Sequence, residues 1–250
     1  LFFILAFFAT TIFAQSQTRS YQYAIDLLNI QNDKVTVSFS PPKNNLKQGK
    51  FIIPKMVPGY YDAMNFGQYI SDFIALDKTG KEMLTQRLDQ NSWMVHDLKN
   101  VANISYRVAD GWDSLQQNTR GAKSAASTFI KDSVFVINYN SLVGYFQEMN
   151  DLSYKINIKK NKDFYASSAL NYKHENDSTD VFSIKSYREL VDAPVLYCVP
   201  DTTWIKVGNA EILISFYNKE ERHYSKKIAN ELENILKNQQ AYLGGKLPVD

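Results

Sequence analysis

Three histidines, His96, His174 and His223, are the side chains of this sequence best suited to hold a catalytic metal ion. The helix of a zinc peptidase carries His-Glu and a second His four residues after the first, so that both imidazoles face one ion. His174 is followed by Glu175, but Ser178 stands where the second histidine is needed, and the other two histidines also lack one at this spacing. The sequence therefore predicts no catalytic residue, no cofactor-binding residue and no metal ligand within these 250 residues.

Other catalytic signatures are missing as well. The sequence has no G-x-S-x-G elbow and no G-x-G-x-x-G loop, and Gly244-Gly245-Lys246 lacks the spacing of a phosphate-binding loop. The acidic pairs Glu220-Glu221 and Asp110/Asp113 stand in polar stretches, which favours solvated charges over the paired carboxylates of a glycosidase. The 16 tyrosines can stack on sugar rings, but strand faces are their more usual place.

The length of the chain, its net charge and its first residues limit the classes of protein to which it can belong. The 250 residues can bury a sizeable core, and 28 basic residues nearly balance 26 acidic ones, so we expect no nucleic-acid partner. Residues 1–14, LFFILAFFATTIFA, are uncharged, shorter than the roughly 20 residues of a membrane span, and followed by polar residues. We interpret them as part of a secretory signal peptide cleaved after Ala14, with an uncleaved anchor as the alternative. The prediction is an exported protein, periplasmic or secreted, that is free of the membrane after cleavage.

Most of the chain alternates apolar and polar residues with period two, the pattern of strands with one buried face. The expected strands are 21–30, 34–39, 51–53, 69–75, 93–98, 101–108, 129–139, 154–158 and 181–184. The expected loops and turns are 31–33, 77–81, 110–127 with a helical turn near 122–126, 140–151 and 173–179. We predict a hairpin from 93–98 and 101–108, and one central strand over 129–139, which is apolar on both faces. Strands at this spacing predict a mainly β fold with an antiparallel β-sandwich over residues 18–186.

A rigid corner at residues 57–60, Val-Pro-Gly-Tyr, lies between the expected strands 51–53 and 69–75. Pro58 fixes its own backbone φ, and Gly59 can supply the positive φ of a type II turn. The strand that follows alternates from Tyr69 to Ala75. The corner therefore predicts a change of chain direction between two strands.

The pattern changes after residue 186. Short strands are expected at 195–199, 204–207 and 211–217, and one long helix at 225–243. The helix has Ser225 as its expected N-cap and Gly244-Gly245 as its stop. Its apolar stripe consists of Ile228, Leu232, Ile235 and Leu236, extended by Tyr242 and Leu243. Only KLPVD follows to cover this stripe, so we expect residues 187–250 to be the beginning of a truncated α+β domain.

Three blocks of sequence, in this order, are similar to the glycyl aminopeptidase family of zinc metallopeptidases. Residues 52–83 contain its Pro-Gly corner and the turn at 77–81, residues 92–108 resemble its pair of strands, and residues 187–197, YRELVDAPVLY, resemble the join to its catalytic domain. Two departures are Met56, where the family has Trp, and Asn32-Asp33-Lys34, where it commonly has His.

The resemblance implies that residues 18–186 are the N-terminal β domain and that 187–250 begin a thermolysin-like catalytic domain, often followed by a PDZ domain. In this family the zinc ligands and the general base belong to a His-Glu-x-x-His motif and a downstream Glu. Both lie C-terminal to the position that corresponds to residue 250 of this sequence. The parent enzyme would remove N-terminal residues such as glycine from peptides with zinc-activated water. Within it, these 250 residues, without a cofactor of their own, would support the downstream catalytic domain and shape access to its cleft.

Two alternatives stay open from the sequence. One is an exported, non-catalytic β-sandwich that serves as a binding or surface module, for example for glycans. The other is a degenerate peptidase homologue retained as a scaffold.

Overall fold

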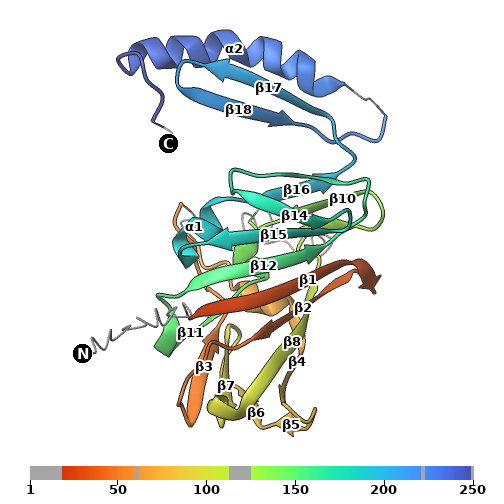
Figure 1. The fold of residues 1–250 in the computed structure, drawn as a ribbon, viewed down its shortest axis with the longest axis vertical. Coiled ribbons are helices and arrows are strands. Elements are labelled where there is room, and N and C mark those ends of the chain that lie inside the picture. The colour runs from red at the N-terminus through yellow and green to blue at the C-terminus, as the bar shows by residue number, and fades with distance from the viewer. Residues whose placement is uncertain (1–18, 60–61, 113–124, 221–222, 249–250) are drawn as a thin grey trace, which may run out of the picture.

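The computed structural model describes residues 19–59, 62–112, 125–220 and 223–248. The predicted signal peptide, Tyr60 of the predicted corner and residues 122–124 of the predicted helical turn lie outside the described residues. The fold is mainly β, as predicted, with one long helix near its C-terminus (Figure 1).

The largest sheet has eight strands. In spatial order they are β14 (Tyr172–Asn176), β15 (Thr179–Ile184), β12 (Ser153–Lys159), β1 (Ser20–Gln31), β2 (Lys34–Ser40), β8 (Val101–Ala109), β4 (Ile70–Asp77) and β5 (Glu82–Met83). All neighbours are antiparallel except β1 and β12, which pair in parallel from Ser20↔Ser153 to Asp26↔Lys159. A parallel pair needs a long crossover, and here the chain between the two strands also builds much of the rest of the fold.

Two four-stranded sheets cover the inner face of the large sheet, so that the body is a sandwich with one continuous apolar core. The first consists of β13 (Tyr165–Ser167), β16 (Val195–Cys198), β10 (Val134–Ile137) and β9 (Thr128–Ile130). The second consists of β11 (Tyr145–Phe146), β3 (Gln48–Ile52), β7 (Ser92–His96) and β6 (Thr85–Arg87). Between the layers, Phe39 of β2 stacks on Phe51 of β3 with ring centroids 5.3 Å apart.

Turn chemistry predicted from the sequence is confirmed at several corners. Asn32 and Asp33 both have positive φ, 53° and 52°, as a two-residue hairpin between β1 and β2 requires. Gly59 has φ 89° at the Pro-Gly corner, and Gly80 has φ 85° in the turn between β4 and β5. The turns at these positions can be predicted from the sequence because short-range steric effects alone determine their backbone φ angles.

The predicted hairpin of residues 93–98 and 101–108 is wrong. β7 pairs with β3 and β6, whereas β8 pairs with β2 and β4 of the large sheet. Asp97, with φ 49°, and the short 3₁₀ helix η2 (Leu98–Asn100) carry the chain from one layer to the other. Leu98 is fully buried there. Two adjacent strands with a short connection resemble a hairpin in sequence whether or not they share a sheet.

The predicted single strand over residues 129–139 is wrong as well. Its residues form a tight hairpin, β9 and β10, with Asp132 at φ 58° in the turn. β10 does lie inside its sheet, between β9 and β16. The sequence pattern did not indicate this turn because it contains neither glycine nor proline.

Two other local expectations need correction. A bulge at Asp72, with φ 54°, shifts the register between Ser71 and Ile74, so β4 does not alternate regularly. Phe73 consequently points inward and stacks on Trp93 at 5.1 Å, while Ser71 accepts a hydrogen bond from Lys34 Nζ. Residues 173–179 were expected as a solvated turn, but most of them form β14, an exposed edge strand of polar residues.

The expected loop at residues 140–151 is in large part buried between the layers. It contains the 3₁₀ helices η4 (Tyr139–Ser141) and η5 (Gln147–Met149), with β11 between them. Leu142 and Val143 are fully buried. The backbone carbonyls of this segment accept hydrogen bonds from four tyrosine hydroxyls: Tyr21 to Met149 (3.0 Å), Tyr23 to Gly144 (2.8 Å), Tyr106 to Leu142 (2.5 Å) and Tyr187 to Val143 (2.8 Å).

We predict that Tyr23→Phe lowers the free energy of unfolding by about 1–3 kcal/mol, because it leaves the buried Gly144 carbonyl without its donor. Tyr154→Phe is the matched control. Tyr154 is equally buried on the neighbouring strand β12, but its hydroxyl has no hydrogen-bond partner among the described residues. Its loss should be neutral or stabilising. Chemical denaturation of both variants measures the difference, and equal destabilisation would contradict the assigned role of the hydroxyl.

We also predict a steep loss of stability above pH 10. Burial raises the pKa of Tyr21, Tyr106 and Tyr154 well above the usual value of about 10. These groups ionise more readily in the unfolded chain, so their contribution is complete below pH 10 and is lost as the pH rises further. Absorbance at 295 nm and circular dichroism should show tyrosinate formation together with unfolding. Smooth titration of every tyrosine in a folded protein would contradict the prediction.

Candidate functional site

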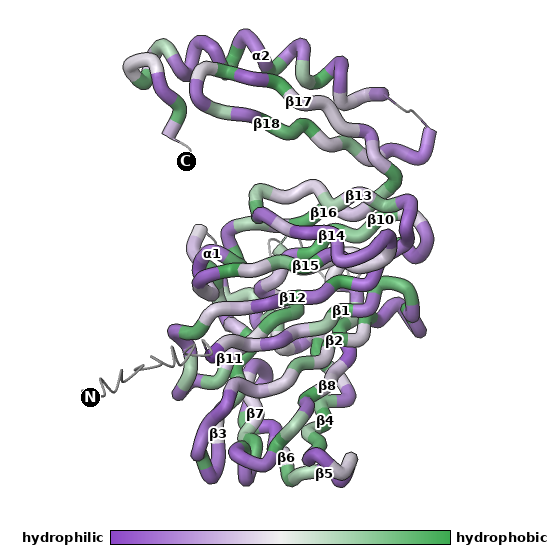
Figure 2. Tube along the Cα trace, in the orientation of Figure 1, coloured by the Kyte–Doolittle hydropathy of each residue, from purple (hydrophilic) through white to green (hydrophobic). Residues whose placement is uncertain are grey.

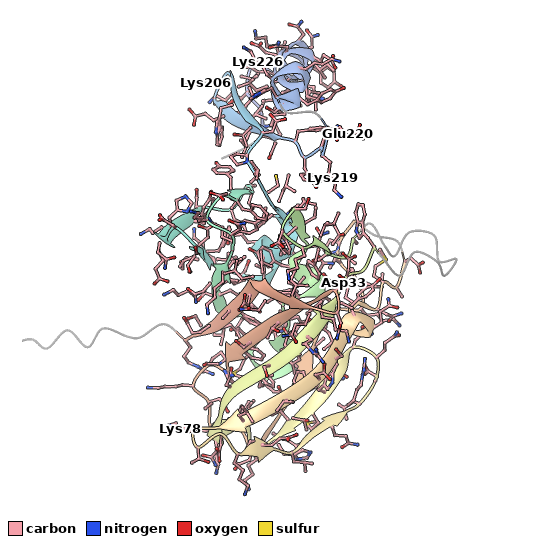
Figure 3. All side chains as sticks on the ribbon, turned by 90° about the vertical axis from the view of Figure 1, so that its right-hand side faces the viewer. Asp33, Lys78, Lys206, Lys219, Glu220 and Lys226 are labelled. Atoms are coloured by element: carbon pink, nitrogen blue, oxygen red, sulfur yellow. The ribbon has the colours of Figure 1, made fainter. Side chains whose placement is uncertain are left out.

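Residues 200–248 form a unit distinct from the sandwich, which we call the hairpin–helix unit. It consists of β17 (Thr202–Val207), β18 (Ala210–Ser215) and α2 (Tyr224–Tyr242), and all three predicted elements are confirmed. The two strands pair along their whole length, and α2 packs on them. In Figure 3, Lys206 and Lys226 mark this unit at one end of the molecule, and Lys78 marks the opposite end of the sandwich.

The start of α2 is capped from outside the helix. The predicted N-cap, Ser225, lies inside the first turn, and the N-cap position is His223 with φ 72° and no side-chain cap. Asp201 takes this role: its carboxylate accepts hydrogen bonds from the backbone N–H of Tyr224 (2.8 Å) and from Ser225 Oγ (2.7 Å). Burial raises the pKa of Asp201, but the hydrogen bonds from Ser225 and Tyr224 outweigh it, so the net shift is downward.

The end of α2 follows the prediction. Gly244 and Gly245 have φ 83° and 95°, and their N–H groups bond the carbonyls of Ala241 and Gln240. On the surface of α2, Glu233 and Lys237, four residues apart, form an ion pair at 2.7 Å.

The apolar stripe of α2 is only partly covered. Ala229 is buried against the strands, but Ile235 is 52% exposed and Leu243 is 51% exposed. On the other face of the hairpin, Trp204 is 59% exposed. The sandwich buries most of its large apolar side chains, although seven of those described are exposed, among them Leu84 at 67%. Figure 2 shows apolar residues on both strands and on the helix of the hairpin–helix unit. Apolar surface on both sides of a thin two-layer unit is typical of a surface that another element covers.

Polar contacts join the hairpin–helix unit to the sandwich. Ser215 Oγ accepts a hydrogen bond from Ser167 Oγ at 2.7 Å, and the hydroxyls of Tyr217 and Ser133 contact each other. The chain enters the unit directly after β16 (Figure 1).

The segment that resembles the join to a catalytic domain, residues 187–197, begins with a short helix, α1 (Tyr187–Asp192). Ser186 Oγ caps it by accepting the Glu189 N–H at 3.2 Å, and Asp192 lies at its exposed C-terminal end. The following strand, β16, pairs with β10 and β13 of the sandwich. Residues 187–198 therefore pack as part of the sandwich, although they follow the boundary predicted after residue 186.

The three histidines lie far apart in the fold: His96 at the end of β7, His174 on β14 and His223 before α2. His174 Nδ1 lies 2.6 Å from Asp180 Oδ1. Within the described ranges, no three His, Cys, Asp or Glu side chains gather in a way that could hold a metal ion. The residues present do not fit a zinc centre, and we derive no catalytic step from them.

The profile of the Peptidase M61 N-terminal domain matches residues 22–199. The chain belongs to this family. The matched M61 N-terminal domain ends one residue after β16, so it spans the sandwich and stops before the hairpin–helix unit. This confirms the coarser part of the resemblance seen in the sequence, an N-terminal domain of a peptidase.

Solved structures are similar in fold. An aminopeptidase N family protein from Idiomarina loihiensis superposes with a TM-score of 0.74 at 16% identity, over 88% of this chain and 36% of that one. Leukotriene A4 hydrolase from Saccharomyces cerevisiae gives 0.46 at 11% identity, over 90% and 35%. An M1 zinc metallopeptidase from Deinococcus radiodurans gives 0.41 at 5%, over 86% and 52%.

The first of these likenesses shows a shared fold, and the chain spans about a third of that protein's length. No curated protein matches the sequence. Among the described helices, none is both long and apolar enough to span a bilayer.

We predict that Asp201→Ala destabilises the hairpin–helix unit by about 0.5–2 kcal/mol, the usual cost of losing an N-cap. Asp201→Asn should cost less, because its amide oxygen still accepts. The folded-state pKa of Asp201 is lowered, so its contribution is present above its ordinary pKa and is lost as the pH falls below it. Hydrogen exchange of the α2 amides at pH 7 and pH 3 measures the effect. Faster exchange in the sandwich rather than in α2 would contradict it.

Proposed function

We propose that this M61 N-terminal domain is the non-catalytic, N-terminal portion of an exported zinc metallo-aminopeptidase of the glycyl aminopeptidase type. The observation that carries the proposal is the family match over residues 22–199, which identifies the sandwich as the N-terminal domain of a peptidase. The ordered blocks of sequence that resemble glycyl aminopeptidases support the finer assignment.

The hairpin–helix unit supports a role beside a further domain. Two-stranded sheets are marginal on their own, and β17 and β18 each have six residues and one unpaired edge. Most other edge strands described are two or three residues long, and the longer β14 is polar and exposed. Together with exposed Trp204 and Ile235, these edges fit a surface on which downstream strands and helices pack.

Within residues 187–250, we propose that α1 and β16 complete the sandwich and that the hairpin–helix unit opens the thermolysin-like catalytic domain. The sandwich would then hold the catalytic domain and narrow the entrance to its cleft for peptide substrates. Zinc would be held by residues of that domain, beyond residue 250. Export rests on the uncharged segment at residues 1–14, and a PDZ domain would follow as in similar enzymes.

The test uses the product of the complete reading frame. We expect it to release N-terminal glycine from short peptides, to lose this activity on chelation and to regain it with added zinc. The 250-residue chain alone is the control and should be inactive. A reading frame without His-Glu-x-x-His after residue 250 would refute the enzyme assignment. Saturable glycan binding by residues 18–186 without metal would favour the binding-module alternative.

A further inference from the structure

A pocket of about 420 Å³ opens at the edge of the sandwich, within the region that matches the M61 N-terminal domain. One wall is the loop after β12, with Lys160, Lys162 and Phe164. The other wall is the end of β14, with His174 and Asn176. The pocket brings together cationic and imidazole side chains that no part of the function described above uses.

Lys160 is a buried cation without a counter-charge. It is only 2% exposed, and its Nζ donates to the backbone carbonyls of Asp177 (3.0 Å) and Asn161 (3.5 Å). Over the ranges that the structure describes, no carboxylate oxygen lies within 4.0 Å of this ammonium group. Carbonyl oxygens satisfy two of its protons but leave its charge uncompensated, and a buried charge is costly unless an opposite charge pairs with it.

His174 is held by a buried carboxylate. Asp180 is fully buried; its Oδ1 lies 2.6 Å from His174 Nδ1, and its Oδ2 accepts a hydrogen bond from Tyr197 at 3.0 Å. A buried carboxylate accepts, so we assign the Nδ1 proton to this bond, which fixes the orientation of the ring. Nε2, on the opposite side of the ring, is left for a second partner, and the His174 side chain is 60% exposed.

The other charged side chains that line the pocket are exposed to solvent. Asp163, Asp177 and Lys162 are exposed, so water and salt screen their charges, whereas the charge of Lys160 is screened far less. A ligand that enters the pocket therefore meets a buried lysine and an oriented imidazole among the residues that line it.

We propose that this pocket binds a small oxyanion, a carboxylate or a phosphate. Lys160 Nζ supplies the counter-charge, and His174 Nε2 donates a hydrogen bond when the imidazole is protonated. Phe164, buried beside Lys160, provides an apolar surface for the carbon atoms of a carboxylate ligand. The site would hold the turn of the β14–β15 hairpin against the loop after β12.

The test is calorimetric titration of the whole chain with inorganic phosphate and with acetate, at an ionic strength held constant with sodium chloride. We expect saturable binding of at least one anion. Binding of phosphate alone assigns a phosphate site, and binding of acetate assigns a carboxylate site. Lys160→Met should weaken binding at least tenfold. Lys159→Met, which changes the exposed neighbour on β12, is the matched control and should bind like the unaltered chain.

A second measurement does not depend on the fold of a variant. In the unaltered chain, the bound anion should shift the imidazole signals of His174 in the NMR spectrum and leave those of His96 and His223 in place. Absence of saturable binding by both anions, or equal weakening in Lys160→Met and Lys159→Met, would overturn the proposal. Equal shifts of all three histidines would show only a general salt effect and would overturn it too.

Discussion

The sandwich depends on hydrogen bonds between tyrosine hydroxyls and a buried stretch of backbone. Residues 139–149 run between the two layers with little strand pairing of their own, and Tyr21, Tyr23, Tyr106 and Tyr187 donate to their carbonyls. A buried carbonyl without a donor costs about 1–3 kcal/mol. The length of a tyrosine side chain therefore fixes how far this segment lies from the large sheet. Gly144 lies so close to β3 that an added Cβ would come within 2.4 Å of the Ile52 carbonyl oxygen.

The same interaction explains why the sandwich extends past residue 186. Tyr187 begins α1, yet its hydroxyl reaches the buried Val143 carbonyl, and β16 follows in the middle of a four-stranded sheet. Removing α1 and β16 would expose the core between β10 and β13. The end of the M61 profile at residue 199 agrees with this physical boundary.

The two parts of the molecule differ in how completely they bury their apolar surface. The sandwich closes on one continuous apolar core, whereas the hairpin–helix unit leaves Trp204 and Ile235 exposed and two strand edges unpaired. Asp201 still gives α2 a defined start, so the unit is locally ordered without being self-sufficient in burial. A well-packed sandwich beside a partly covered unit fits the proposed supporting role.

The sequence by itself determined the features that depend on neighbouring residues alone, namely individual strands, the long helix and the turns. Periodicity located β1, β2, β12 and α2, and the residues Asn32-Asp33 and Gly244-Gly245 determined a hairpin turn and a helix end. Only the tertiary structure decided that β7 and β8 belong to different sheets, that residues 139–149 are buried, and that Asp201 caps α2. Those features join residues far apart in the chain, 121 positions in the case of Tyr23 and Gly144. A local pattern cannot reveal which distant partner completes a hydrogen bond, because that choice exists only once the layers have packed.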